Sequence, residues 1–170
     1  ENLYRGEALG LRAYLHFDLL RMFGWGDLVN TPANLDKLCI PYVTRYHKTM
    51  TPQSTVREAL QYIHQDLEEA EKLLAYYDVY HQNAQEEDYE LPDNDGFYKE
   101  RRGRFNYYAA RATQARVYMW EGKYREALER VSLFTGNPQP VSWVDLDRSV
   151  INAELTYRDL SFTTEHIFNL

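Results

Sequence analysis

Apolar residues recur at the three- and four-residue spacing of an amphipathic helix in four separate windows, and this periodicity limits the fold more than any other feature of the sequence. The windows span residues 6–23, 55–76, 106–121 and 123–134. Glycines that can stop a helix follow the first window and separate the third from the fourth, at Gly24 and Gly122. The pattern predicts an all-α fold in which long irregular loops connect the helices.

The first window carries two apolar stripes instead of one. One stripe is Ala8, Leu11, Leu15, Leu19 and Met22, and the other is Leu9, Ala13, Phe17 and Leu20. Because the stripes lie well apart on the helix surface, we expect an interior helix with neighbours on two sides. Arg12 lies between the stripes, where its guanidinium needs a carboxylate or carbonyl partner, so we expect a structural role for it.

The second window opens with Thr55-Val56-Arg57-Glu58, which has the form of a capping box. In this motif the Thr hydroxyl and the Glu carboxylate each accept from a backbone N–H group that would otherwise lack a partner. A helix should therefore begin at this point.

The remaining segments show no sustained period. Residues 27–53 contain three prolines and are expected to form an ordered or partly extended connection. Residues 81–104 place acidic residues before basic ones, and we expect a solvated loop because exposed ion pairs contribute only ~0–1 kcal/mol. Residues 143–170 should form short helical or extended pieces, with Ile167 and Phe168 returning to a core.

Composition narrows the function classes. Lys and Arg total 19 against 26 Asp and Glu, and the net charge of -7 argues against a nucleic-acid partner, which would favour a basic face. Cys39 is the one cysteine, so the chain has neither an internal disulfide nor a thiolate zinc site. No stretch approaches the ~20 apolar residues of a membrane-spanning helix. Residues 1–7 do not resemble a signal peptide, so any export signal is expected upstream.

Catalytic and metal-binding motifs are absent or out of register. The five histidines form no His-Glu-x-x-His pair, and there is no Gly-x-Ser-x-Gly nucleophile elbow. Asp93-Asn94-Asp95-Gly96 resembles the middle of an EF-hand loop, but Leu91 and Arg102 would stand where carboxylates are required. We therefore expect no catalytic residue, no metal and no cofactor. A glycosidase-like carboxylate pair stays open, because such a pair is set by separation in space.

The third and fourth windows predict a helical hairpin with the spacing of a tetratricopeptide repeat. In Gly122-x-Tyr124-x-x-Ala127 the glycine permits a tight turn, the tyrosine wedges between helices and the alanine permits close packing. A lone repeat cannot bury its apolar face. The first two helices should therefore supply flanking layers.

Several segments, taken in order, make the chain resemble the SusD/RagB family. They are Glu7-Ala8-Leu9-x-Leu11-Arg12-Ala13 with its continuation to Phe23-Gly24, Ile40-Pro41-Tyr42-Val43-Thr44, Thr55-Val56 leading to Ile63-x-x-Asp66-Leu67-x-x-Ala70, Arg104-Phe105-Asn106, Gly122-Lys123-Tyr124-x-x-Ala127 and Glu165-x-Ile167-Phe168. Each segment alone is weak evidence. Their order, and their spread over most of residues 1–170, make the resemblance specific.

The resemblance implies that residues 1–170 are a SusD-like, tetratricopeptide-like helical region within a longer parent protein. It implies a surface-exposed lipoprotein of the outer membrane of Bacteroidetes-type bacteria, anchored through an upstream lipid that this chain lacks. Its partners would be an oligosaccharide or other nutrient and a SusC-like TonB-dependent transporter, to which it delivers the ligand without catalysis. Two alternatives to this receptor function stay open. The second hypothesis is a cytoplasmic repeat scaffold that binds peptides, and the third is an all-helical glycosidase.

Aromatic residues in the loops are the candidate ligand contacts, because sugar rings present apolar C–H faces that stack on aromatic planes. Trp25 lies between Gly24 and Gly26, which would let its ring project. The other candidates lie in polar connections and are Tyr42, Tyr46, Phe97 and Tyr98. For each of the five, packing against its own scaffold is the competing interpretation.

Overall fold

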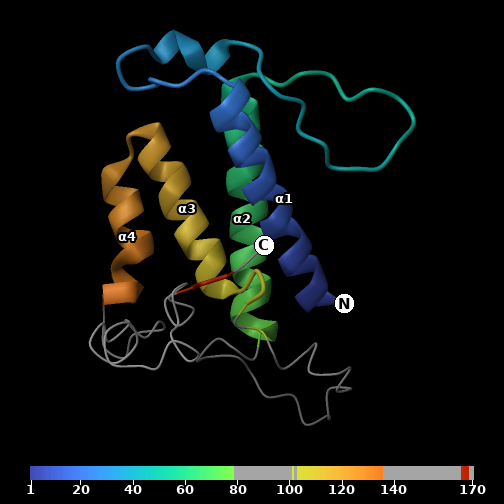
Figure 1. Cartoon of the computed structure of the whole chain (residues 1–170), viewed down its shortest axis with the longest axis vertical. Coiled ribbons are helices and arrows are strands. Elements are labelled where there is room, and N and C mark those ends of the chain that lie inside the picture. The colour runs from blue at the N-terminus through green and yellow to red at the C-terminus, as the bar shows by residue number, and fades with distance from the viewer. Residues whose placement is uncertain (79–100, 102, 136–165, 169–170) are drawn as a thin grey trace, which may run out of the picture.

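The computed structural model describes residues 1–78, 101, 103–135 and 166–168 (Figure 1). Its helices are α1 (Asn2–Phe23), α2 (Val56–Tyr77), α3 (Tyr107–Glu121) and α4 (Tyr124–Thr135), with a short 3-10 helix, η1 (Pro32–Asp36), between α1 and α2. The described part contains no strand, and its one isolated β-bridge pairs Leu38 with Thr55. The all-α prediction is confirmed. The main difference is that α1 begins at Asn2 and not at residue 6.

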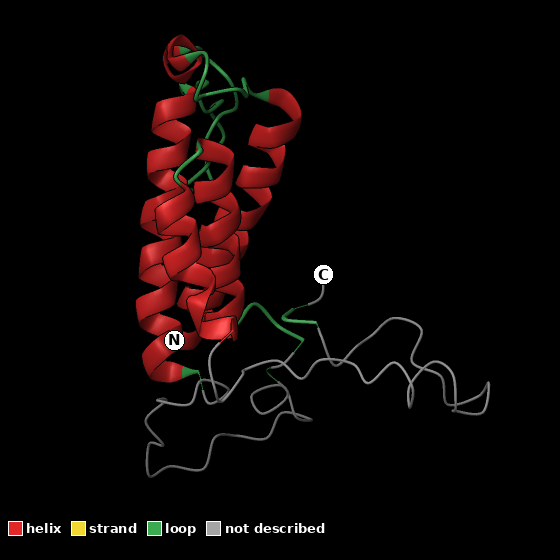
Figure 2. Cartoon of the chain, turned by 90° about the vertical axis from the view of Figure 1, so that its left-hand side faces the viewer, coloured by secondary structure: helices red, strands yellow, loops and turns green. Residues whose placement is uncertain are grey.

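The helices lie side by side in the order α4, α3, α2, α1 (Figure 1). α1 and α2 make the most extensive contact, and α3 packs between α2 and α4. Residues 24–55 gather at one end of these helices, whereas residues 101, 103–106 and 166–168 lie towards the other (Figure 2). The structure is thus two antiparallel helix pairs, α1–α2 and α3–α4, joined through α2 and α3.

Only one of the two apolar stripes of α1 is buried. Ala13, Phe17 and Leu20 are fully buried in the core, whereas Leu15 and Met22 are 51% and 64% exposed. The prediction of an interior helix with neighbours on two sides was therefore wrong for the described residues. The reason is that α2 covers one side of α1, while α3 touches α1 at few points.

The helix ends carry the capping residues that the sequence predicts at Thr55 and Gly122, and a further cap at Asn106. The Thr55 hydroxyl accepts from the Glu58 backbone N–H, and the Glu58 carboxylate accepts from the Thr55 backbone N–H, which confirms the capping box. The Thr55 backbone N–H and hydroxyl both donate to the Glu58 carboxylate, and these two hydrogen bonds lower the pKa of Glu58. Asn106 caps α3 through its side-chain oxygen, which accepts from Ala109 N at 3.0 Å. α3 ends at Gly122, whose φ of 78° is the left-handed conformation that favours glycine.

The α3–α4 turn only partly follows the tetratricopeptide pattern. Ala127 is buried, as predicted, but Tyr124 is 67% exposed and does not wedge between helices. Leu128, one turn further along α4, is equally exposed. Among the described residues α4 packs along α3 and also reaches α2 through Arg130, but no described helix covers the face that carries Tyr124 and Leu128.

Arg101 corrects the prediction that residues 81–104 form a solvated loop. Its side chain is 1% exposed, and its Nη1 donates to Glu7 Oε2 at 2.8 Å while its Nε donates to Asp78 Oδ1 at 3.3 Å. Burial opposes the charge, but the two carboxylates outweigh it and raise the pKa of Arg101. The acidic residues 86–95 lie outside the described part.

The predicted return of the C-terminal segment to the core is confirmed at Phe168. Its ring makes edge-to-face contacts with Tyr14 and Phe105, each with ring centroids 5.2 Å apart. Asn106 Nδ2 donates to the carbonyl oxygen of Ile167 at 2.9 Å. This contact joins the segment to the first turn of α3.

Candidate functional site

Residues 41–53, hereafter the 41–53 loop, project from the end of α1 and α2 (Figure 1). Their two ends are joined by backbone hydrogen bonds. Cys39 N donates to Ser54 O at 2.8 Å, Ser54 N donates to Ile40 O at 3.0 Å, and Val56 N donates to Lys37 O at 3.0 Å. Three hydrogen bonds next to the Leu38–Thr55 bridge close the base of the loop.

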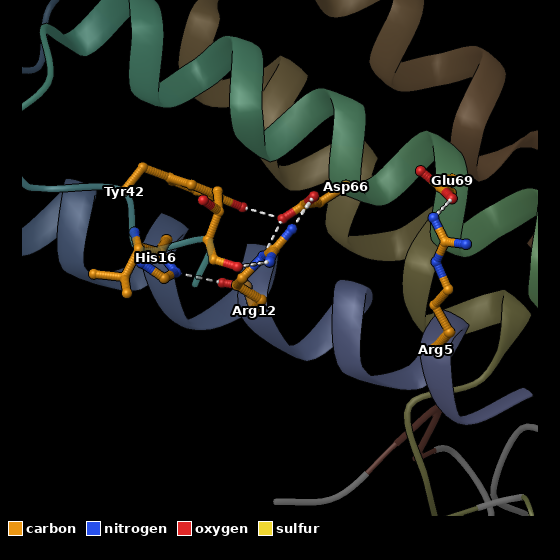
Figure 3. A network of polar contacts seen from close by, with 8 residues as sticks. Arg5, Arg12, His16, Tyr42, Asp66 and Glu69 are labelled. Atoms are coloured by element: carbon orange, nitrogen blue, oxygen red, sulfur yellow. Dashed lines mark hydrogen bonds and ion pairs between the residues drawn. The ribbon is translucent and has the colours of Figure 1, made fainter. Parts of the chain in front are cut away.

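A polar network between α1 and α2 holds the start of this loop (Figure 3). Arg12 donates to both oxygens of Asp66, from Nε at 2.7 Å and from Nη2 at 2.6 Å. Arg12 Nη1 also donates to the carbonyl oxygen of Thr44 at 3.2 Å. The expectation that Arg12 needs a carboxylate or carbonyl partner is confirmed. The hydrogen bond with Asp66 raises the pKa of Arg12, so the guanidinium stays charged.

Tyr42 completes the network from the loop side. Its hydroxyl donates to Asp66 Oδ2, and its ring packs against His16 (Figure 3). The ring also stacks on Tyr62. Burial and the bond to Asp66 raise the pKa of Tyr42 above its ordinary value, so it remains a neutral donor. The residue is only 4% exposed. This burial does not fit the predicted ligand contact at Tyr42, and we assign the residue to the scaffold.

His16 adds a second anchor. Val43 N donates to His16 Nε2 at 3.1 Å, and because Nε2 accepts, the proton resides on Nδ1, which lies 2.8 Å from the carbonyl oxygen of Arg12. The neutral imidazole therefore bridges α1 and the loop backbone. Residues 42–44 are fixed by three side chains from the two long helices.

Trp25 is half-exposed, and its orientation is fixed. Its Nε1 donates to the carbonyl oxygen of Leu38 at 3.2 Å, and the Lys37 ammonium lies 4.0 Å from its ring centroid. The indole therefore offers apolar surface beside a positive charge. Of the other predicted contacts, Tyr46 is 100% exposed in the 41–53 loop. Phe97 and Tyr98 lie outside the described residues.

A cleft of about 320 Å³ opens where residues 28–35, the start of α2 and the α3–α4 turn meet. Apolar and polar groups share its lining, which consists of Leu28, Leu35, Arg57, Leu60, Gln61, His64, Glu121 and Lys123. Small-ligand sites are typically concave, with an apolar surface and a few convergent polar groups. This cleft has that composition.

The charges in the cleft are paired. Glu121 accepts from Lys123 at 2.7 Å, and its other oxygen lies 2.6 Å from His64 Nε2. Burial would raise the pKa of Glu121, but these two hydrogen bonds lower it, so the carboxylate is ionised. Arg57 donates to Asp36 at 2.9 Å. With its charges neutralised in pairs, the cleft would contact uncharged polar parts of a ligand, and contacts to any charged groups of that ligand would come from outside the cleft.

Comparison with known proteins decides the family. A SusD-like family model, described as starch-binding associating with outer membrane, matches residues 2–87, half of the chain. The chain belongs to this SusD-like family. Among the described residues of the SusD-like chain, none of the helices has the length and apolar content to cross a membrane. No curated protein matches the sequence.

Solved structures agree with this SusD-like assignment. A SusD superfamily protein from Bacteroides vulgatus ATCC 8482 is 30% identical, with a TM-score of 0.55 over 77% of this chain. A putative sugar binding protein from the same organism is 27% identical, with a TM-score of 0.56 over 77% of this chain. A SusD superfamily protein from Bacteroides thetaiotaomicron VPI-5482 is 25% identical, with a TM-score of 0.58 over 80%. The chain spans only about a quarter of the length of each.

The match to the SusD-like model covers Trp25, the 41–53 loop and the Arg12–Asp66 network, but not the Glu121 side of the cleft. Sequence reasoning missed the cleft because its lining comes from three separate segments. Two lining residues lie in motifs that the sequence did reveal, Arg57 in the capping box and Lys123 after the turn at Gly122. These motifs predict helix ends and do not by themselves indicate a cleft.

Proposed function

We propose that this SusD-like protein captures a glycan or another nutrient at the outer surface of the outer membrane and passes it, unchanged, to a SusC-like TonB-dependent transporter. The match of residues 2–87 to a starch-binding, outer-membrane-associated family carries the proposal. A similar solved structure, named as a putative sugar binding protein, supports the same ligand class. Attachment through an upstream lipid anchor belongs to this proposal.

The proposed ligand surface includes Trp25 and the cleft. The half-exposed indole of Trp25 provides a stacking plane for the C–H face of a sugar, and its bond to Leu38 fixes the ring. In the cleft, the Gln61 amide has no hydrogen-bond partner among the described residues, so it is available to sugar hydroxyls. Leu28 and Leu60 supply apolar contact beside it.

The cleft lining supports binding in preference to hydrolysis. A glycosidase uses two carboxyl groups placed on either side of the bond that it cleaves. In the part of the chain that the structure describes, Glu121 is the one carboxylate that lines the cleft, and it is held ionised by two donors. An ionised, doubly hydrogen-bonded carboxylate is poorly suited to act as a general acid.

The test incubates the full-length protein with a panel of plant and host glycans and follows the soluble sugars by mass spectrometry. A receptor depletes an intact glycan, whereas a glycosidase releases new products. Co-purification with the TonB-dependent transporter encoded nearby tests the partner. Turnover that is lost on substituting a single Asp or Glu would overturn the proposal, and so would the absence of both glycan binding and transporter association.

Substitution of Trp25 locates the surface. We expect Trp25→Ala to weaken glycan binding by about tenfold or more, because stacking of an aromatic ring contributes roughly 0.5–1.5 kcal/mol beyond the area buried. Tyr124→Ala is the matched control, since Tyr124 is also an exposed aromatic residue but lies on α4. Equal affinities of the two variants would remove Trp25 from the proposed surface.

A further inference from the structure

Two long stretches of this acidic chain, residues 37–57 and 101–120, carry only positive charge. In the second stretch the arginines that the structure describes are paired with carboxylates, so the first is of interest here. Between Asp36 and Glu58 there is no Asp or Glu, whereas residues 37–57 contain four Lys or Arg residues, in a chain of net charge -7. The four are Lys37, Arg45, Lys48 and Arg57. The 41–53 loop, which projects from the helices (Figure 1), carries two of the four, Arg45 and Lys48.

Two of these four cationic side chains pair with other described groups, and two do not. Arg57 is neutralised by Asp36, and Lys37 lies over the Trp25 ring. Arg45 and Lys48 are exposed, and neither has a hydrogen bond or ion pair with any other described residue. Two free cations therefore flank Tyr46, whose side chain is completely exposed.

The loop that presents these groups is anchored at its base and supported near its tip. The hydrogen bonds of Cys39 and Ser54 close the base. Near the tip, the His47 ring lies 2.9 Å from the Thr49 hydroxyl and 3.4 Å from that of Thr51. A segment that is already ordered loses less entropy when a ligand binds.

We propose that the 41–53 loop binds an acidic glycan, one whose sugar units carry carboxylate or sulfate groups. This inference rests on the proposed function and names its ligand class. Tyr46 would stack on the C–H face of a sugar ring while Arg45 and Lys48 pair with the acidic groups, as guanidinium and ammonium groups do with carboxylate and sulfate oxygens. Arg45 and Lys48 have no carboxylate partner among the described residues, so they would give a polyanion a favourable local potential on a chain whose net charge is -7.

Matched ligands that differ only in charge test the inference with the full-length protein. The pairs are polygalacturonate with its full methyl ester, and chondroitin sulfate with its desulfated, carboxyl-reduced form; starch and xylan are the neutral panel. Calorimetry should show at least one acidic glycan bound about tenfold or more tightly than its neutralised form, because two charge-assisted hydrogen bonds are lost. The preference should shrink between about 20 mM and about 200 mM salt as the charges are screened.

The variant Arg45→Ser/Lys48→Ser should lose this preference. Its control, Lys72→Ser/Arg125→Ser, removes the same charges from exposed positions on α2 and α4 and should keep it. Neutral glycan binding with no acidic preference would overturn this inference and leave the proposed function standing. Failure to bind any glycan would also overturn this inference, and it would overturn the proposed function as well if transporter association were absent too.

Two further outcomes distinguish other partners of a basic loop. A single-stranded oligonucleotide of matched length, bound as tightly as the acidic glycan, would overturn the inference in favour of a general polyanion surface. Loss of transporter association in Arg45→Ser/Lys48→Ser, with glycan affinities unchanged, would overturn it in favour of protein docking. Unchanged melting temperatures would show that both double variants are folded.

Discussion

The two helix pairs of this protein are held together in different ways. α1 and α2 have 22 residues each and are joined by a long connection, and partners far apart in sequence, such as Arg12 and Asp66, bridge them. α3 and α4 have 15 and 12 residues and are joined by a tight turn at Gly122. The first pair depends on a buried apolar core and on long-range polar contacts. The second depends on local turn geometry and on its attachment to α2.

That attachment centres on Glu71 of α2. One oxygen accepts from Arg111 of α3 at 2.8 Å, and the other accepts from Gln114 of α3 and Arg130 of α4, each at 2.9 Å. A single carboxylate on the long pair therefore holds both helices of the short pair. The comparison predicts that substitutions at long-range contacts cost more than substitutions within the α3–α4 pair.

The largest effect is expected at Arg101, which joins α1 to the end of α2 through Glu7 and Asp78. Arg101→Met nearly keeps the volume but removes the positive charge that faces the fully buried Asp78. We expect a loss of about 3–5 kcal/mol in the free energy of unfolding, measured by urea titration followed by circular dichroism. Arg104→Met is the control, since Arg104 lies 3.7 Å from Glu7 and is one-third exposed. Equal losses of unfolding free energy in the two variants would show that the burial of Arg101 does not set the size of the effect.

Glu71→Gln should have the next largest effect. The amide keeps the shape but loses the charge that Arg111 and Arg130 share, so we expect a loss of about 1.5–3 kcal/mol in the free energy of unfolding. Exchange of backbone amide hydrogens should rise more in α3 and α4 than in α1. A uniform rise over all four helices would contradict the assignment of Glu71 to the attachment of the short pair.

Ala115→Leu tests packing within α3. Ala115 is 3% exposed in a helix that packs between α2 and α4, so the larger side chain should overpack the contact and lower the free energy of unfolding by about 1–3 kcal/mol. Ala112→Leu is the matched control. Ala112 is only partly buried and lines an open surface pocket, so its change should be smaller. An unchanged melting temperature of Ala115→Leu would show that this face tolerates bulk.

The smallest effect concerns pH. The pKa of Glu121 is lowered in the folded protein, so its contribution is fully present above the pKa of the unfolded chain and is lost as the pH falls through the folded value. The free energy of unfolding of the wild type should therefore exceed that of Glu121→Gln at neutral pH, and this difference should disappear in acid. We expect a difference of about 0–1 kcal/mol at neutral pH, measured by thermal unfolding across the acid range. A difference that grows as the pH falls would have the wrong sign.

The same contrast explains what the sequence could predict. The capping box at Thr55 and the turn at Gly122 depend on residues within a few positions, and both were confirmed. Arg12 was expected to need a partner from its place between two stripes, but periodicity does not identify a partner 54 positions away. The burial of Arg101 was missed because Glu7 lies 94 positions away and joins it only after α1 and α2 have packed.

The candidate site divides in the same way. The glycines around Trp25 indicated an exposed indole, and the structure places the ring half-exposed beside Lys37. The polar neighbours of Tyr42 suggested a surface loop, but the Asp66 carboxylate draws its hydroxyl into the scaffold. Sequence pattern finds aromatic residues in loops. Whether a ring faces outward depends on partners that the fold supplies.

The closed base of the 41–53 loop also matters for how such a protein evolves. Because residues 37–40 are hydrogen-bonded to residues 54–56, the loop ends stay adjacent whatever sequence lies between them. Doubling the length of a flexible loop costs only about 0.6 kcal/mol in closure entropy. Insertions and substitutions at the tip are therefore tolerated while the helices keep their sequence. The loop can therefore change in length and sequence without changing the hydrogen bonds that close its base.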